Sequence, residues 1–344
     1  MTKRTILTAC FSSAGILILI LDGQTALAGG AAGLELCLKT VIPSLFPFLF
    51  LCSMLTSALW GQPVPWLRPL ATALGIPEGG ESLLVAGILG GYPAGAQAIG
   101  ETFRNGLLSR EDAEHLLSFC SNAGPAFLFG ITARQFPELS MVWALWAIQL
   151  LSAMAVGMWH RQKTISRVNL LSASPSVCRC LIQTVRTMAV ICGWIMLFQI
   201  LLRFLSRWFL WYLSQEMQVL VTCLLELSSG CCSLPRIESI HQRFLVCSLM
   251  LSFGGLCVTM QTASVIDGLS IGIYLRGKLM QTCTALFLSG LYLLLDWPGL
   301  TAAAAFLGLA ACLMKKRVDF PEEPVYNTTI TAGRKQIHAV PKKN

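Results

Sequence analysis

The residues best suited to chemistry in this chain are polar side chains that interrupt long apolar stretches. They are Gln97, Ser121, Asn122, Ser228, Ser229 and Gln261. Polar groups are costly in hydrocarbon unless they are paired, line a wet cavity or bind a ligand. Hydroxyl and amide groups can hydrogen-bond a small solute, or they can bond to neighbouring helices. The pattern therefore predicts either a solute-binding site or polar helix packing inside a membrane.

Glu226 is the carboxylate that stands out, because it follows an uncharged segment over residues 219–225. A glutamate inside a membrane is a candidate for coupling to a cation, with a proton or sodium as the ion. A structural ion pair with Arg203 or Arg236 explains its position equally well. Coupling and ion pairing both stay open for this residue.

The chain carries few signs of catalysis. It contains neither the His-Glu-x-x-His pattern of metalloproteases nor the Gly-x-x-x-x-Gly-Lys-Ser/Thr pattern of nucleotide-binding loops. Its 14 cysteines are spread along the chain without Cys-x-x-Cys spacing, so they fit the role of small apolar side chains. We therefore expect no enzyme, no cofactor and no metal site.

The elements that must hold the polar residues are membrane-spanning helices. Of the 344 residues, 55% are hydrophobic and only 12% are charged, against about 25% charged in soluble proteins. Stretches free of Asp, Glu, Lys, Arg and His cover residues 5–21, 40–67, 82–100, 116–133, 139–159, 187–202, 244–266, 279–295 and 297–314. A spanning helix needs about 20 mostly apolar residues. We expect an all-α polytopic membrane protein with about eight membrane-spanning segments.

The basic residues indicate the orientation of these segments. They lie at the N-terminus (Lys3), in an acid-free loop over residues 161–175, and in the tail over residues 315–344. The positive-inside rule places all three on the cytoplasmic side of a bacterial cell membrane. The net charge of +8 is not gathered on one face, so no nucleic-acid partner is expected.

Four regions follow from this arrangement. We expect an N-terminal membrane half over residues 1–160, the cytoplasmic loop 161–175, a C-terminal membrane half over residues 176–314 and a disordered cytoplasmic tail over residues 315–344. The partners expected for the two halves are membrane lipid and a small anionic substrate. Whether the chain forms a homo-oligomer stays open.

The two halves share a pattern of interrupted helices. The interrupting residues are Gly91, Tyr92, Pro93, Gly95, Gly124 and Pro125 in the first half, and Gly254 and Gly255 in the second, where they follow Glu226. Broken helix is tolerated in lipid only where it is buried in protein or lines a wet cavity. Paired broken helices in two repeats are typical of transporters, whose half-helix N-termini face anions. We expect two gate-like repeats in inverted orientation, with spanning or re-entrant hairpins and a substrate site where the breaks meet.

A short charged segment separates the two breaks of the first half. Asn105 and Gly106 form a turn signal, and Ser109 followed by Asp112 predicts the N-cap of a new helix. The charged residues beside this turn, Glu101 among them, fit a solvated surface better than a site.

These motifs in this order resemble the YlbJ-type sporulation integral membrane proteins, which carry a nucleoside-recognition gate domain. The resemblance runs from about residue 5 to 312 and rests on Glu35 with Ile42-Pro43-Ser44-Leu45-Phe46-Pro47-Phe48, Gly91-Tyr92-Pro93-Ala94-Gly95-Ala96, Leu117-Ser118-Phe119 with Ser121-Asn122-Ala123-Gly124-Pro125, Leu225-Glu226, Leu251-Ser252-Phe253-Gly254-Gly255-Leu256 and Gln261. The family residues that carry over are Gly91, Pro93, Gly95, Ser121, Asn122, Pro125, Glu226, Gly254, Gly255 and Gln261.

The resemblance implies a role in endospore formation in Firmicutes, in the mother-cell membrane around the forespore. It implies transport of dipicolinate, a planar dianion, out of the mother cell towards the forespore. A non-transporting scaffold of a sporulation complex and a nucleoside-type transporter are the alternatives. Gln97 stands where the family has Lys, and Cys257-Val258-Thr259 stand where it has Ser-Val-His. These departures leave room for another small anionic substrate.

Overall fold

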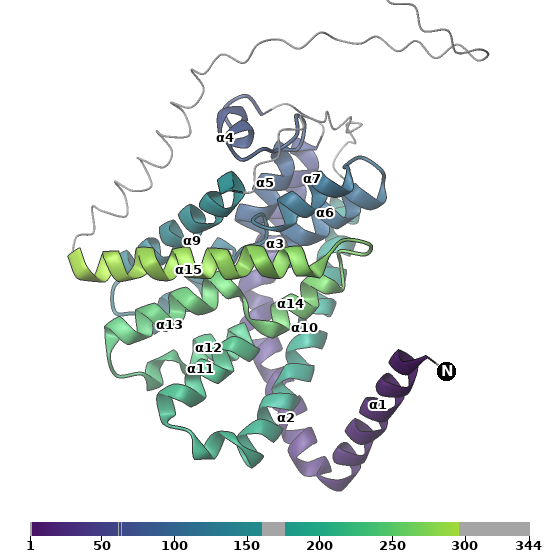
Figure 1. Ribbon diagram of the computed structural model, residues 1–344, viewed down its shortest axis with the longest axis vertical. Coiled ribbons are helices and arrows are strands. Elements are labelled where there is room, and N and C mark those ends of the chain that lie inside the picture. The colour runs from purple at the N-terminus through teal and green to yellow at the C-terminus, as the bar shows by residue number, and fades with distance from the viewer. Residues whose placement is uncertain (1, 61, 63, 160–175, 296–344) are drawn as a thin grey trace, which may run out of the picture.

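The protein is all-α in the part of the chain that the structure describes. This computed structural model describes residues 2–60, 62, 64–159 and 176–295, which contain helices and loops but no β-strand (Figure 1). The predicted loop 161–175, the uncharged stretch 297–314 and the tail 315–344 lie outside the described residues. The predicted fold class is confirmed.

Five helical segments among the described residues are long and apolar enough to cross a membrane. They are the continuous run of α2 (Gly23–Leu36), η1 (Cys37–Val41) and α3 (Ile42–Leu59), then α9 (Leu139–Trp159), α10 (Val177–Trp208), the pair α13 (Ile240–Phe253) and α14 (Gly255–Ala263), and α15 (Ile271–Leu295). Large apolar side chains such as Leu51, Leu197 and Phe287 are exposed on them, as contact with lipid requires. The protein is therefore a multi-pass membrane protein.

The remaining helices of the described residues are shorter. They are α1 (Lys3–Leu21), α4 (Arg68–Ala73), α5 (Glu81–Val85), η2 (Ala86–Gly90), α6 (Ala94–Arg104), α7 (Arg110–Leu117), α8 (Pro125–Gly130), η3 (Thr132–Gln135), η4 (Leu210–Tyr212), α11 (Gln215–Leu225), α12 (Leu227–Ser233) and η5 (Leu234–Arg236). Ser109 accepts a hydrogen bond from the Asp112 amide at 3.0 Å, which confirms the predicted N-cap of α7.

Each half contains two helices that are interrupted by a short break. In the first half α5 and η2 stop before α6, and α7 stops before α8; in the second half α11 stops before α12, and α13 stops before α14. Gly91 and Gly254 take φ values of 74° and 85°, a left-handed conformation that glycine adopts without a steric penalty. Two of the four breaks therefore lie at these glycines; the break before α8 ends at Gly124, and the break between α11 and α12 lies at Glu226.

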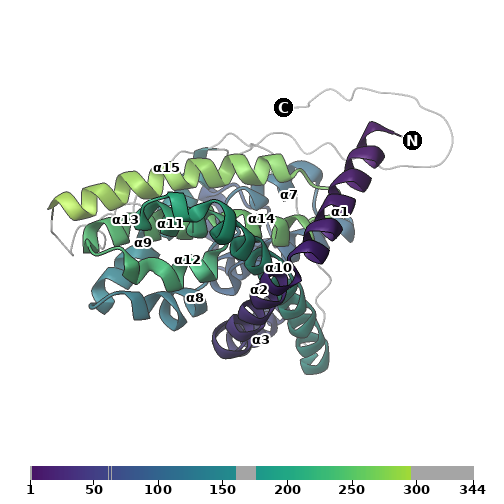
Figure 2. The same ribbon diagram turned by 90° about the horizontal axis from the view of Figure 1, so that it is seen from below.

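α15 brings the two halves together. It packs against α9 and α7 of the first half and against α13 and α14 of the second. Figure 1 shows α15 lying across the molecule with α13 and α9 beside it, whereas α2, α3 and α10 run in another direction. Figure 2 shows α1 and α2 at one edge of the helical body, away from α13. α10 packs along both α2 and α3.

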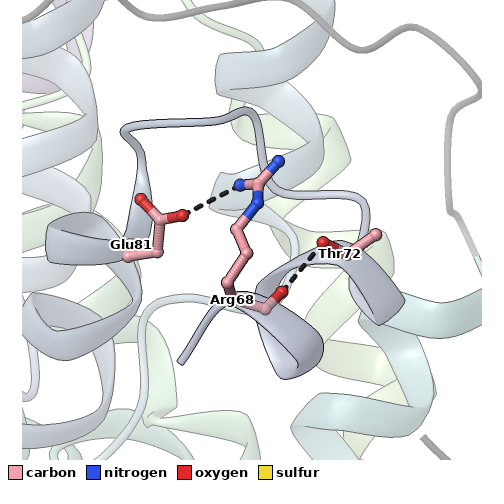
Figure 3. A network of polar contacts seen from close by, with 3 residues as sticks. All are labelled: Arg68, Thr72 and Glu81. Carbon is pink, nitrogen blue, oxygen red and sulfur yellow. Dashed lines mark hydrogen bonds and ion pairs between the residues drawn. The ribbon is translucent and has the colours of Figure 1, made fainter. Parts of the chain in front are cut away.

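An ion pair ties the start of α4 to the start of α5 (Figure 3). Nη1 of Arg68 donates to Oε1 of Glu81 at 2.9 Å, and the Glu81 side chain is only 2% exposed. The hydroxyl of Thr72 donates to the carbonyl of Arg68 at 2.8 Å and steadies the same turn. Arg68 thus neutralises a carboxylate that the fold buries.

We expect Arg68→Met to destabilise the protein by about 1–3 kcal/mol, because the buried Glu81 carboxylate loses its charged partner. Arg110→Met is the control, since Arg110 is 56% exposed and lies 3.5 Å from its partner Glu114. Thermal unfolding in detergent compares the two variants. Equal midpoints for both would show that the Arg68–Glu81 pair contributes nothing to stability.

Candidate functional site

A small cavity lies where the breaks of the two halves meet. Its volume is about 40 Å³, and its wall includes Gly91, Tyr92 and Gly124 of the first half and Glu226, Ser228 and Gln261 of the second. Six residues of the predicted set thus surround one space. A cavity of this size holds about one or two waters. Binding a larger solute there requires the helices to move.

Lys278 of α15 is a buried lysine beside this cavity. Its side chain is fully buried, and Nζ donates to the Tyr92 hydroxyl at 3.0 Å, to Asn122 Oδ1 at 3.3 Å and to Gln281 Oε1 at 2.7 Å. The backbone carbonyl of Ser121 is a fourth acceptor within reach, so the three N–H groups of a protonated Lys278 are shared among four oxygens. These acceptors are all uncharged, and among the described residues no carboxylate forms an ion pair with Lys278.

Amide groups extend this cluster to the break of the second half. Gln281 Nε2 donates to Asn122 Oδ1 at 2.8 Å and to the carbonyl of Gln149 at 3.3 Å. Gln149 Nε2 and the Tyr92 hydroxyl both donate to the carbonyl of Leu251, each at 3.3 Å. Gln149 Oε1 is buried and has no hydrogen-bond partner among the described residues. One polar network therefore joins both breaks through α9 and α15.

Tyr92 separates Lys278 from the cavity. The ring of Tyr92 belongs to the cavity wall, and the Lys278 ammonium lies 4.9 Å from the centre of that ring. Gly254 also packs against Tyr92, because a Cβ on this glycine would lie 3.2 Å from Cζ of the ring. A glycine at this position leaves room for the aromatic ring.

The other predicted residues have structural positions. Pro93 and Pro125 lie at the beginnings of α6 and α8, where a missing backbone N–H costs nothing. A Cβ on Gly95 would overlap the carbonyl of Cys120, and one on Gly255 would lie 3.2 Å from the carbonyls of Cys223 and Leu224. Gly95 and Gly255 therefore permit close backbone packing.

Two of the predicted polar side chains point elsewhere. Gln97 lines a second, larger cavity between α3, α6 and α10. Ser229 accepts a hydrogen bond from Gln199 of α10. Neither of them lines the cavity between the breaks. The predicted role of these residues in substrate binding stays a prediction.

Glu226 caps the short helix α12. Its carboxylate accepts hydrogen bonds from the amides of Ser228 at 2.8 Å and Ser229 at 2.7 Å, and the side chain is buried. Neither Arg203 nor Arg236 forms an ion pair with it among the described residues. The carboxylate therefore pairs with free amides at the N-terminus of α12, which is the positive end of the helix dipole. The coupling role predicted for Glu226 is not tested by this geometry.

We expect Glu226→Ala to lower the stability by about 1–2 kcal/mol, because two amides lose their cap. Glu226→Gln retains one acceptor oxygen and should lose less. Hydrogen exchange at the amides of Ser228 and Ser229 and thermal unfolding measure the effect. Glu216→Ala is the control, because Glu216 is exposed in the first turn of α11. Equal exchange at the two amides in the alanine variant and the unmodified protein would contradict the cap.

The geometry offers no support for catalysis at the one Gly-x-Ser-x-Gly pentapeptide, residues 268–272. A nucleophile elbow of this pattern connects a strand to a helix. Here Ser270 is exposed in the turn before α15, in a described region that holds no strand. Within the described residues no group of three His, Cys, Asp or Glu side chains could hold a metal ion.

Sequence reasoning missed Lys278, Gln281 and Gln149. Lys278 stands at the end of an uncharged stretch, where a basic residue is expected at the membrane surface. One signal in the sequence could have found them: Lys278 and Gln281 are three positions apart, which places two polar side chains on the same face of a helix. Their burial against the first break becomes visible only in the folded chain.

Comparisons with known proteins support the resemblance in part. No protein-family model matches the chain, and no solved structure matches it. Over 164 residues the chain is 30% identical to the sporulation integral membrane protein YlbJ of Bacillus subtilis (strain 168). The match covers 46% of this chain and 40% of that protein. This similarity supports a YlbJ-like membrane protein, and the nucleoside-recognition gate domain stays a prediction.

Proposed function

We propose that this multi-pass membrane protein transports a small organic anion during sporulation, with dipicolinate as the substrate. The observation that carries the proposal is the fully buried Lys278, whose hydrogen-bond acceptors are all neutral. It lies where the two interrupted helices of the first half meet α15.

A buried ammonium without a counter-ion favours an anionic ligand. Neutral acceptors satisfy the N–H groups of Lys278 but do not neutralise its charge, and an isolated charge is costly in a low-dielectric interior. A carboxylate that reaches Nζ would form a charge-assisted hydrogen bond, which is stronger than a neutral one. Among small solutes, anions therefore gain the most from this site.

Access to Lys278 requires Tyr92 to move. The cavity of about 40 Å³ is far below the roughly 300–1,000 Å³ of typical ligand pockets. Tyr92 is adjacent to the left-handed Gly91 and packs against the left-handed Gly254. Two glycine breaks beside one aromatic ring provide the backbone freedom for opening. The described conformation is then a closed state of the transporter.

The cellular role in the proposal comes from the relative. The Bacillus subtilis protein is named as a sporulation integral membrane protein. We place this chain in the mother-cell membrane around the forespore, with both termini in the cytoplasm as the basic segments indicate.

Uptake of radiolabelled dipicolinate into proteoliposomes tests the proposal, with empty liposomes as the control. We expect saturable uptake that unlabelled dipicolinate inhibits and uridine does not. Uridine flux in place of dipicolinate flux would favour a nucleoside-type transporter. Verified insertion without flux, under proton and sodium gradients of either sign, would favour a non-transporting scaffold.

A further inference from the structure

A polar groove of about 400 Å³ lies between α2 and α10, apart from the two cavities described above. Its wall consists of Gln24, Thr25 and Ala28 of α2 and Arg203, Ser206 and Arg207 of α10. Two guanidinium groups, an amide and two hydroxyls therefore face this space, and no carboxylate belongs to its wall. Hydrogen-bond donors with a positive charge favour an anionic occupant.

The guanidinium of Arg203 has no protein partner among the described residues. It forms no ion pair and no side-chain hydrogen bond there. The beginning of its side chain is nevertheless held in place, because a Cβ on Gly29 of α2 would lie 3.2 Å from Cβ of Arg203. The close approach of α2 and α10 thus fixes where an unpaired cation enters the groove.

Arg207 is partly neutralised by the start of α2. Its Nε lies 3.2 Å from Oδ2 of Asp22, and its Nη1 donates to the hydroxyl of Thr25 at 3.4 Å. Asp22 also caps α2 by accepting from the amide of Thr25 at 3.4 Å. Two arginines and one aspartate leave one positive charge at the groove.

The groove lies at the end of an apolar stretch of α10. This stretch, residues 187–202, is uncharged and lies between Arg186 and Arg203 in a helix that is apolar enough to cross a membrane. As a helix it is about 24 Å long, close to the hydrocarbon thickness of about 30 Å. Arg203 is therefore expected at the level of the lipid headgroups.

Aromatic side chains support the same level. Figure 1 shows the turn between α1 and α2 at the lower end of the molecule. The exposed aromatic side chains that follow Arg207 in the chain are Trp208, Phe209, Trp211 and Tyr212. Such residues are enriched where a membrane protein crosses the headgroup region.

Apolar side chains are exposed beside the groove as well. Leu27 of α2 and Leu201 of α10 are 72% and 43% exposed, and each is within two positions of a residue of the wall. In a membrane they would contact acyl chains. A phosphate ester that is dissolved in water gains nothing from them, whereas a phospholipid can use the cationic groove and the apolar surface together.

We infer that this groove binds the phosphate group of an anionic phospholipid, with Arg203 as its principal contact. The planar guanidinium fork matches two phosphate oxygens, and Gln24 and Ser206 supply neutral donors for the others. The single negative charge of a phosphatidylglycerol headgroup balances the one positive charge of the groove. Phosphatidylcholine brings its own cation and gains less. The inference does not depend on what the protein transports.

Native mass spectrometry of the purified protein in detergent tests the inference, with phosphatidylglycerol and phosphatidylcholine of identical acyl chains added in equal amounts. We expect the protein to retain phosphatidylglycerol about tenfold or more in preference to phosphatidylcholine, the scale of one charge-assisted hydrogen bond. Arg203→Gln should lose this preference. Arg203→Lys should keep part of it, because lysine retains the charge but not the fork.

Arg186→Gln is the matched control and should keep the preference. Arg186 is an exposed arginine of the same helix, at the other end of the uncharged stretch. Thermal unfolding without added lipid checks that Arg203→Gln is folded. Its midpoint should equal that of the unmodified protein, because Arg203 has no protein partner to lose.

Asp22→Asn should increase the affinity for phosphatidylglycerol. Asparagine caps a helix about as well as aspartate, so α2 keeps its N-cap while the groove loses its nearest negative charge. Arg207 then becomes available to the phosphate. Weaker retention of phosphatidylglycerol by a folded Asp22→Asn variant would contradict the charge argument.

Three other outcomes would overturn the inference. Equal retention of the two lipids by the unmodified protein would show that the groove does not select an anion. A preference that Arg203→Gln retains in full would place the lipid elsewhere. Displacement of phosphatidylglycerol by an equal amount of glycerol 3-phosphate would show that the site takes a dissolved phosphate ester and not a lipid.

Discussion

Lys278→Met should reduce the apparent affinity for dipicolinate by about 10- to 100-fold. This loss corresponds to one charge-assisted hydrogen bond of about 1.5–3 kcal/mol. Methionine keeps the length and the linear shape of the lysine side chain but removes the ammonium. Because Lys278 is the cation that contacts Asn122 and Tyr92, no other group at the two breaks can replace its charge.

The same substitution should leave the protein folded. Removal of a buried charge recovers its desolvation cost, which offsets part of the loss at the Ser121 carbonyl and at Gln281 Oε1, two acceptors left without their donor. Asn122 Oδ1 also retains its hydrogen bond from Gln281 at 2.8 Å. The thermal midpoint of Lys278→Met should therefore fall moderately, while the variant is still recovered as folded protein.

The control is Arg276→Met, which removes a cation two residues away on the exposed side of α15. Concentration-dependent uptake into proteoliposomes gives the affinity of each variant. Uptake by Lys278→Met with the affinity of the unmodified protein would show that Lys278 is structural, and the proposed anion site would be rejected.

Gly95→Ala should strongly destabilise the protein. A Cβ at this position of α6 would overlap the carbonyl of Cys120 and would lie 2.8 Å from the Cα of Gly87. Both obstacles are backbone atoms of buried segments, which cannot turn aside as a side chain can. Overpacking of this kind costs about 3 kcal/mol. A loss of this size is a large fraction of the roughly 5–15 kcal/mol by which folded proteins are stable.

Gly193→Ala is the matched control, because a Cβ on Gly193 in α10 would meet no atom within 4 Å. Alanine has a higher helix propensity than glycine, so this variant should be as stable as the unmodified protein or slightly more stable. Yield of monodisperse protein and thermal unfolding in detergent compare the two. A Gly95→Ala variant with the thermal midpoint of the unmodified protein would contradict the close backbone packing at Gly95.

Local signals in the sequence predicted much of the secondary structure. The N-cap at Ser109 and the breaks at Gly91 and Gly254 appear where expected, because caps and left-handed turns depend on a few adjacent residues. The meeting of six candidate residues around one cavity agrees with the expectation that the breaks lie together. The roles of these residues in binding stay predictions.

Long-range contacts decided the chemistry of the site. The turn at Asn105 and Gly106 is exposed as predicted, but Glu101 before it, in α6, is half-buried and accepts from Gln183 of α10, 82 positions further along the chain. Lys278, which the sequence analysis did not single out, is buried against Asn122 from 156 positions away. Both partners are far away in the sequence, so no local pattern contains them.

The sequence by itself determined that this chain is a helical membrane protein with interrupted helices, because the lack of charge and the positions of glycine and proline act through the local backbone and its solvent. Only the tertiary structure decided which polar groups face each other. α15 packs against the break at Ser121 and Asn122, and this contact converts a lysine that looks solvated into a buried cation. Burial and electrostatic environment are properties of the packed helices, and the candidate site therefore emerges only when they assemble.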